Sequence, residues 1–552
     1  MGKSNPPTRK PTAPGKSVPT KGVPGKAAPN KSVPAKSSRG AAAPDQGEAR
    51  AKKKPMWRPG PLPHAPHKAR KLESVSDIRR FFHRNEEPVF FISATNFNLL
   101  NIDEWVHRFR FINYIDCFDG KHPNVFVPSP QDHPPFQSLE DVNKYLLRHP
   151  EVREYIQSRG SSGKALFLFF DDEIEQLCEE LGLEVCFPSA QLRTEIDNKI
   201  NTTRIGNRAR VQSVPNVLAK DVTSWSKLRK LAAEKLGTDL VLQTSFGDSG
   251  HTTFFVKKKK DFDEIKHELP ADEEIKIMKR VDCVQAAVEA CITRCGTLVG
   301  PLMTELVGFE EMTPYRGGWC GNEVFADAFN RRIRDQARRK TVALGKELAK
   351  EGYRGYFEVD YLIDRADGKV YLGEINPRIT GASSMTNLAA FAQADAPLFL
   401  FHLLEWMGVD FEIDVEELNL RWSDPENIDS WSQMVLKHTD DDLRLVNHAP
   451  RSGVWGLGED GSVEFLRPQT HRRTVEREWE GFFLRIASAG DLLYEGADLG
   501  ILITPGRLMD EKGKLTDRAR AWAQGIVGQY RTVAAGDDAV QHAPEIGRFK
   551  IY

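Results

Sequence analysis

The chain has 552 residues, 40% of them hydrophobic, and a formal net charge of −1, which together favour several globular domains. Its longest apolar candidate, Ala165–Phe170, is far too short to span a bilayer, and the N-terminus lacks the apolar core of a secretory signal. The seven cysteines are odd in number, and none has the Cys-x-x-Cys spacing of a zinc site. We therefore expect a soluble protein with reduced thiols, no membrane partner and a cytoplasmic location.

The first 71 residues differ from the rest in charge. They carry 17 Lys or Arg and 2 Asp or Glu, a net of +15, which leaves −16 for the other 481 residues. Proline and lysine each recur every five residues between Pro14 and Lys36, so we expect a disordered, extended tail. Evenly spaced cations suit a polyanion such as nucleic acid. A solubilising tail, or one that touches the acidic body, is an equal alternative.

Four compact apolar runs open the folded part of the chain. They lie at Pro88–Ala94, Arg110–Asp116, Lys164–Phe170 and Leu183–Phe187, and we predict a buried strand at each. The third run leads into a helix with acids in its first turn, where the helix dipole favours them. Strand, helix and strand at this spacing predict a parallel, doubly wound unit.

The next stretch alternates helices with short strands. We predict a helix over Glu195–Arg210, capped by Thr194, and a second over Ser226–Leu236. The strand Asp239–Thr244 then runs into a loop, residues 245–253, that reads Ser-Phe-Gly-Asp-Ser-Gly-His-Thr-Thr. A glycine and serine loop between antiparallel strands can close over phosphates with its backbone N–H groups.

Further strands and one long helix follow. Glu274–Arg280 and Gln285–Thr293 alternate in hydrophobicity and predict antiparallel strands that can cover a nucleotide. The glycines of Tyr315–Asn322 indicate a flexible active-site loop. Asp327–Glu351 predicts a long helix with one wall that is solvated or faces phosphate.

The most informative stretch is a predicted hairpin between Gly355 and Arg378. Strands Gly355–Ile363 and Lys369–Ile375 flank an Asp-Gly turn, and the first carries Asp360. Glu374, Asn376 and Arg378 alternate at the end of the second, so they share a face. Two acids and an amide are hard oxygen ligands for Mg²⁺, and the arginine can grip a phosphate or carboxylate. The alternative is a surface hairpin with solvated charges.

Residues 405–552 predict short glycine-separated strands and a final helix over Arg518–Val533. A small β-rich domain fits this pattern, and a scaffold that only packs against the rest is an equal alternative.

These pieces, in this order, resemble the ATP-grasp superfamily and its biotin-carboxylase-like and carboxylate–amine ligase branch. The resemblance runs from about Pro88 to Leu404 and is most specific at Phe357-Glu-Val-Asp360 and Gly373-Glu-Ile-Asn-Pro-Arg378. It implies an α/β and α+β multidomain fold: a basic tail (1–71), a Rossmann-like pre-ATP-grasp domain (72–193), an ATP-grasp domain (194–404) and a β-rich C-terminal domain (405–552).

The resemblance also implies roles for particular residues. Asp360, Glu374 and Asn376 match ligands of Mg²⁺ or Mn²⁺, and Arg378, beside Asn376, matches the arginine that holds the acyl phosphate or substrate carboxylate. Lys199 looks like the first ATP-binding lysine. The remaining positions that match nucleotide contacts are Gln243, Gly247, Ser249, Gly250, Met278, Lys279 and Arg280.

The chain departs from the family in three places. Gln243 stands where the family has its second lysine, and the hinge at 277–280 lacks the usual glutamate. After Arg378, the chain reads Ile-Thr-Gly-Ala-Ser-Ser instead of the Gln-Val-Glu-His of biotin carboxylases, and small residues at Gly381–Ser384 could make a carboxylate pocket.

Three hypotheses for function follow from the resemblance. The first is an ATP- and Mg²⁺-dependent ligase that activates a small-molecule carboxylate as an acyl phosphate for attack by an amine. The second is a biotin carboxylase component that acts with a separate biotin carrier. The third is a non-catalytic nucleotide-binding protein whose tail contacts nucleic acid.

Overall fold

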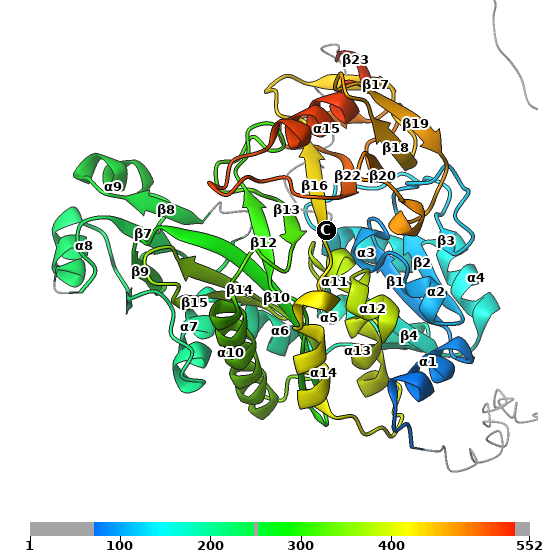
Figure 1. Cartoon of the computed structure of the whole chain (residues 1–552), viewed down its shortest axis with the longest axis horizontal. Helices are drawn as coiled ribbons and strands as arrows, with labels where there is room; N and C mark the ends of the chain where they lie inside the picture. Colours follow the sequence, from blue (N-terminus) through cyan, green and yellow to red (C-terminus); the bar gives the residue numbers. More distant parts are fainter. Residues whose placement is uncertain (1–70, 234, 248–251, 536–552) are drawn as a thin grey trace, which may run out of the picture. The chain divides into compact units, whose positions relative to one another are not determined.

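The computed structural model describes residues 71–233, 235–247 and 252–535. All of them belong to one compact unit, His67–Tyr552. Within the described residues, the strands form four sheets (Figure 1). No helix among these residues combines the length and apolar character needed to cross a membrane.

The first sheet is parallel and doubly wound, with the order β3-β2-β1-β4-β5. All four predicted strands are present, and Asp171 caps the acidic helix by accepting a hydrogen bond from the backbone N–H of Ile174. Every residue of β1 is buried, as expected of a strand covered on both faces. The elements are α1 (Val75–His83), β1 (Val89–Ser93), η1 (Phe97–Leu99), α2 (Ile102–Trp105), β2 (Phe109–Asn113), β3 (Val125–Phe126), α3 (Leu139–Arg148), α4 (Pro150–Arg159), β4 (Gly163–Leu166), α5 (Asp172–Glu180) and β5 (Leu183–Val185).

The single helix predicted over Glu195–Arg210 is wrong, because two helices meet at Asn198. Helix α6 (Ala190–Asp197) is capped by Ser189, and not by Thr194. Helix α7 (Lys199–Arg208) is capped by the Asn198 side chain, which accepts from two backbone N–H groups of the first turn. Asparagine is a preferred N-cap, and its extended backbone breaks the run. Lys199 therefore opens a helix.

The second sheet is antiparallel, with the order β6-β9-β7-β8. Helices α8 and α9 lie beside it (Figure 1), and they share an apolar core with alternate residues of β7 and β9. The opposite face of these strands borders a cleft at Val241, Gln243 and Met278. The elements are β6 (Asn216–Ala219), α8 (Trp225–Ala232), β7 (Leu240–Gln243), β8 (Thr253–Val256), α9 (Lys259–Ile265) and β9 (Ile275–Lys279).

The largest sheet joins the centre of the chain to its C-terminal part. Strand β13 pairs with β16, and β16 pairs with β22, so strands beyond residue 405 extend the central sheet. Helix α10 packs on β10 and β11. The predicted loop over Tyr315–Asn322 is only half correct, since β13 begins at Trp319. The central elements are β10 (Cys283–Thr293), β11 (Gly296–Val299), β12 (Met303–Val307), β13 (Trp319–Val324), α10 (Arg331–Lys350), β14 (Gly355–Asp364) and β15 (Val370–Asn376).

The C-terminal part is rich in strands, as expected. The predicted final helix is too long: α15 stops at Val527, and Arg531–Ala534 forms a strand that pairs with β17. The elements are α11 (Ser383–Asn387), α12 (Ala390–Ala394), α13 (Leu398–Trp406), α14 (Val415–Trp422), η2 (Pro425–Asn427), β16 (Trp431–Lys437), β17 (Arg444–His448), β18 (Gly453–Leu457), β19 (Val463–Arg467), η3 (Arg472–Thr474), β20 (Glu480–Arg485), β21 (Leu492–Leu493), β22 (Asp498–Pro505), α15 (Asp517–Val527) and β23 (Arg531–Ala534).

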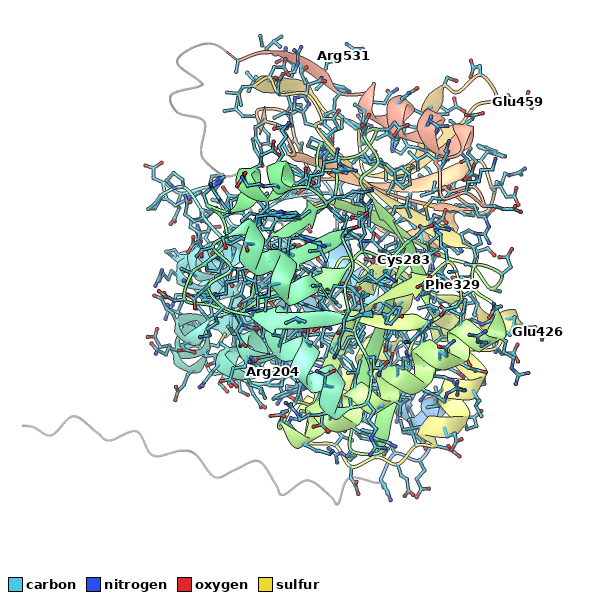
Figure 2. The ribbon with its side chains drawn as sticks, turned by 90° about the vertical axis from the view of Figure 1, so that its left-hand side faces the viewer. Arg204, Cys283, Phe329, Glu426, Glu459 and Arg531 are labelled. Atoms are coloured by element: carbon cyan, nitrogen blue, oxygen red, sulfur yellow. The ribbon has the colours of Figure 1, made fainter. Side chains whose placement is uncertain are left out.

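Figure 2 shows the side chains from another side, with Cys283 at the start of β10 and Phe329 just before α10. All seven cysteines are free thiols.

Candidate nucleotide and metal site

The predicted hairpin is present as β14 and β15. The two strands are antiparallel, and Asp360 lies opposite Glu374 while Glu358 lies opposite Asn376. Gly368 turns the chain between them with a φ of +68°, a conformation that glycine adopts without strain. Directly opposed residues share a face of the sheet, so these four polar side chains lie together.

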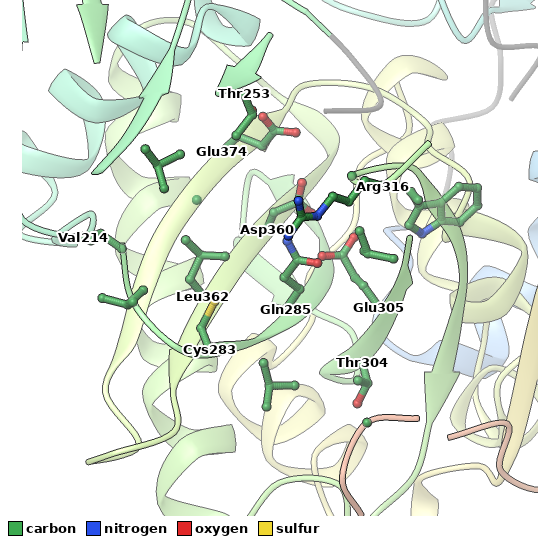
Figure 3. A pocket seen from close by; sticks show the side chains of 18 of the residues that line it. Val214, Thr253, Cys283, Gln285, Thr304, Glu305, Arg316, Asp360, Leu362 and Glu374 are labelled. Atoms are coloured by element: carbon green, nitrogen blue, oxygen red, sulfur yellow. The ribbon is translucent and has the colours of Figure 1, made fainter. Parts of the chain in front are cut away.

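Two further acids surround Asp360. Glu358 precedes it by two residues on β14, and Glu305 comes from β12; Figure 3 shows Glu305, Asp360 and Glu374 around one cleft. Burial, reinforced by the charges of Glu305, Glu358 and Glu374, holds the pKa of Asp360 well above its ordinary value. Burial and the charges of Glu289 and Glu305 do the same to the pKa of Glu358. The cluster concentrates negative charge that a cation would neutralise.

Asn376 and Arg378 are tied to this cluster by hydrogen bonds. Asn376 Nδ2 donates to Glu358 Oε2 and to Asp360 Oδ2, each at 3.2 Å. Arg378 Nη2 donates to Asn376 Oδ1 at 2.9 Å. The Arg378 guanidinium also lies 4.6 Å from the ring centre of Phe169, which follows β4. An arginine held on both sides presents its remaining donors to the cleft in a fixed direction.

The cluster has the chemistry of a divalent-cation site. Asp360 Oδ1 is buried and has no hydrogen-bond partner among the residues that the structure describes. A buried carboxylate oxygen without a partner is costly, and a bound cation removes that cost. Carboxylate and amide oxygens are the ligands that Mg²⁺ and Mn²⁺ prefer. The predicted set of Asp360, Glu374 and Asn376 thus fits the proposed metal.

Lys199 reaches the same cluster from the first turn of α7. Its ammonium forms an ion pair with Glu374, and its backbone N–H donates to Ser245 O at 2.8 Å. Burial opposes the charge of Lys199, but the Glu374 carboxylate outweighs it and raises the pKa of the lysine. Lys199 is therefore not a solvated surface lysine, because it is buried beside a carboxylate.

The other residues predicted to contact the nucleotide lie on or next to the four-stranded sheet. Gln243 ends β7 and donates from Nε2 to Thr253 Oγ1 at 3.2 Å. Met278 is buried on β9, and Lys279 and Arg280 border the same cleft. The Arg280 guanidinium lies 5.1 Å from the ring centre of Phe255. These residues form one wall of the cleft.

Only part of the predicted phosphate loop can be placed. Gly247 has a φ of +138°, and a Cβ there would come within 2.0 Å of Thr252 Oγ1, so glycine is required. Ser249 and Gly250 lie outside the described residues.

One cleft brings these groups together. It has a volume of about 1660 Å³, large enough for a nucleotide and a second ligand. The C-terminal part borders it with Arg507, Met509, Asp510, Glu511 and Gly513. Glu323 on β13 holds that segment, because its carboxylate accepts hydrogen bonds from the backbone N–H groups of Leu508 and Met509. The C-terminal part therefore contributes to the cleft as well as packing against the central sheet.

Residues 381–384, where the sequence predicts a carboxylate pocket, border the cleft only in part. Gly381 and Ala382 border the cleft, and a Cβ on Gly381 would come within 2.3 Å of the Trp319 ring. Ser383 and Ser384 point away from it instead: their hydroxyl groups donate to Glu289 and Gln433. Both serines are buried, and their hydrogen bonds stabilise the fold.

Sequence reasoning missed Glu305, Glu358 and Lys276. Glu358 could have been found, because it alternates with Asp360 on the same strand. Glu305 and Lys276 lie on β12 and β9, and only the pairing of distant strands brings them to the site.

Comparisons with known proteins define the fold. No protein-family model matches the chain, and no curated protein matches it. Among solved structures, biotin carboxylase from Campylobacter jejuni, in a β,γ-ATP complex, gives a TM-score of 0.53 at 11% identity, covering 83% of this chain and 97% of that one.

Two other carboxylases are similar to the chain. The biotin carboxylase domain of Hydrogenobacter thermophilus 2-oxoglutarate carboxylase, with MgADP, ADP and bicarbonate, gives a TM-score of 0.51 at 11% identity, covering 84% of this chain and 96% of that one. Rhizobium etli pyruvate carboxylase gives 0.51 at 14% identity, covering 83% of this chain and 41% of that one. The chain has the ATP-grasp fold that biotin carboxylases share, as the sequence motifs predicted.

Proposed function

We propose that the protein is an ATP-dependent ligase that activates a carboxylate as an acyl phosphate for attack by an amine. One observation carries the proposal: Asp360, Glu374, Asn376 and Arg378 form a single connected cluster, and Lys199 reaches it from another helix. A protein that only binds nucleotide has no need of a fixed arginine beside its metal ligands.

The proposed reaction has two steps. A carboxylate oxygen of the first substrate attacks the γ-phosphorus of ATP, the bond from that phosphorus to the β–γ bridging oxygen breaks, and ADP leaves. The amine then attacks the acyl carbon, phosphate leaves, and the nitrogen loses a proton. Such phosphoryl transfer depends mainly on positioning and charge neutralisation.

The residues of the cleft have separate roles in this proposal. Asp360, Glu374 and Asn376 would hold Mg²⁺, which supplies positive charge against the phosphates. Lys199, now paired with Glu374, would bind phosphate oxygens when the nucleotide is present. The guanidinium of Arg378, fixed by Asn376 and Phe169, orients the acceptor carboxylate and stabilises the charge that develops on it.

Carboxylation is a narrower version of the same chemistry. The similar structures include biotin carboxylases, one of them bound to bicarbonate. Against this version, the residues after Arg378 are Ile379, Thr380 and Gly381, and Thr380 donates its hydroxyl hydrogen bond to buried Glu289. We therefore favour an organic carboxylate over bicarbonate, and both belong in the test.

The test is ADP release from Mg²⁺-ATP by the purified protein, with a panel of amino acids and small carboxylates that includes bicarbonate with and without biotin. Glu374→Gln removes a proposed ligand at nearly constant shape, and Glu459→Gln, an exposed acid after β18, is the matched control. We expect ADP release that requires a panel member, persists in the control and is lost in Glu374→Gln. If the protein binds ATP but releases no ADP in the presence of any panel member, the non-catalytic hypothesis would be favoured.

A further inference from the structure

The cleft lacks a cation at one expected position. The resemblance places a phosphate-binding lysine at residue 243, on the strand before the glycine loop, and this chain has glutamine there. The Gln243 amide already donates to Thr253 Oγ1 at 3.2 Å. An amide can donate hydrogen bonds, but it carries no charge to offset that of a triphosphate.

A lysine lies directly across the sheet from this position. Strands β7 and β9 are antiparallel, and their register pairs Gln243 with Lys276. Directly opposed residues have their Cβ atoms about 5 Å apart on the same face. Val241 and Met278 are paired two residues further along, share that face, and border the cleft. Lys276 is therefore on the cleft side of the sheet.

Lys276 is fully buried, unlike an ordinary surface lysine. It is 1% exposed, and among the described residues it has no carboxylate within ion-pair distance. A buried ammonium without an anionic partner is costly, and an anion bound beside Lys276 would remove that cost.

The charges around Lys276 belong to the same site. Burial, and after it the charge of Lys199, lowers the pKa of Lys276 to about 8, while the Glu374 carboxylate acts in the opposite direction. Lys199 and Glu374 are the residues that we assign to phosphate and metal, so Lys276 lies within their electrostatic reach.

We propose that Lys276 supplies from β9 the phosphate-binding cation that position 243 lacks, so that the ammonium reaches the phosphates of a nucleoside triphosphate from the neighbouring strand. This inference rests on the proposed function, because it requires that the cleft binds ATP. The inference places the phosphate-binding charge on β9 instead of β7, and the group that it binds is still the triphosphate of ATP.

The experiment measures the dissociation constants of Mg²⁺-ATP and adenosine by titration calorimetry in the full-length protein. Lys276→Met should weaken ATP binding by about 10- to 100-fold and leave adenosine binding unchanged, since only ATP carries the phosphates. Lys266→Met, an exposed lysine after α9, is the matched control and should bind ATP as the wild type does. Lys276→Arg, which keeps the charge, should retain most of the affinity.

A charge swap keeps the proposal falsifiable if Lys276→Met fails to fold. The double variant Gln243→Lys/Lys276→Gln moves the cation back to β7, and we expect it to bind ATP more tightly than Lys276→Gln alone. Equal ATP affinity in wild type and Lys276→Met would overturn the inference and leave the proposed function intact. A wild-type protein that binds no ATP would overturn both.

Discussion

At the scale of single residues, the main feature of this cleft is its buried acidic side chains. Asp360 and Glu358 are buried and have other acids around them, so their carboxylate forms are disfavoured in the folded chain. Residues arranged for binding are commonly destabilising in the absence of the ligand, because selection for function overrides local stability. The same arrangement should therefore be visible in both stability and binding.

Asp360→Asn should separate these two effects. The folded pKa of Asp360 lies above its unfolded value, so this residue lowers the free energy of unfolding as the pH rises above about 4. The variant should therefore have a higher Tm than the wild type at pH 8 without nucleotide, yet bind Mg²⁺-ATP about 10- to 100-fold more weakly. Thermal unfolding with and without Mg²⁺-ATP measures both. A lower Tm at pH 8 would contradict the repulsion that we infer.

Much of the candidate site follows from the sequence alone. The alternation of Glu374, Asn376 and Arg378 and the turn before them predicted the hairpin, because strand periodicity is a local property. Lys276 could not be predicted, since its role depends on the register between β7 and β9. A slip of one residue in that register would turn its side chain to the opposite face.

At the scale of elements, the break between α6 and α7 matters most for function. Asn198 ends α6 and caps α7. The cap fixes the first turn of α7, and that turn carries Lys199. The sequence between 190 and 208 is helical in character throughout, so hydrophobic periodicity alone predicted one helix. The Asn198 side chain decides between the two outcomes, because it satisfies backbone N–H groups that would otherwise lack partners.

Asn198→Ala tests this link between the helix cap and the site. Losing the cap should lower the free energy of unfolding by about 1 kcal/mol. It should also weaken Mg²⁺-ATP binding, because the first turn that carries Lys199 frays. Asn198→Asp keeps the acceptor and serves as the control, in urea unfolding and in ATP titration. Unchanged ATP affinity in Asn198→Ala would show that the cap does not position Lys199.

His402 links helix α13 to the start of β14. Its Nδ1 accepts from the backbone N–H of Tyr356 at 3.0 Å, and its ring lies 4.5 Å from that of Phe187. Burial lowers the pKa of His402 to about 3. Since the unfolded chain takes up a proton near pH 6.5 and the folded chain does not, this residue costs stability as the pH falls from about 6.5 towards 3.

His402→Gln should therefore change the pH dependence of stability as well as its magnitude. We expect a lower free energy of unfolding at pH 8, because aromatic packing is lost, but a shallower decline below pH 6.5. The slope assigned to His402 approaches about 1.4 kcal/mol per pH unit between its two pKa values. Urea unfolding at several pH values measures it, and an identical slope in wild type and variant would contradict the assignment.

At the scale of the whole molecule, one sheet connects the centre of the chain to its C-terminal part. The β13–β16 pairing and the contact of Glu323 with Leu508 and Met509 carry the C-terminal part to the cleft. Short glycine-separated strands predicted a β-rich region, but they could not predict its partner. Long-range strand pairing is set by tertiary packing, which a local pattern does not contain. The domain boundaries at 193 and 404 remain predictions.

The basic tail remains a prediction from charge alone, since residues 1–70 lie outside the described part of the chain. Removing them should leave the Tm and the affinity for Mg²⁺-ATP unchanged, because the site is built from later residues. Binding to a polyanion, measured with heparin or single-stranded DNA, should be lost on removal and should weaken steeply with salt in the full chain. A change in ATP affinity on removal would instead favour a tail that acts on the acidic body.

The most direct test of the central claim follows the oxygen atoms of the carboxylate. The purified protein is incubated with Mg²⁺-ATP, amines and a pool of carboxylates labelled with ¹⁸O, and the mass of the released phosphate is measured. Formation of an acyl phosphate moves one carboxylate oxygen onto phosphorus, so we predict phosphate that carries one ¹⁸O. Release of unlabelled phosphate alone would mean that water attacks ATP, and it would contradict the ligase mechanism.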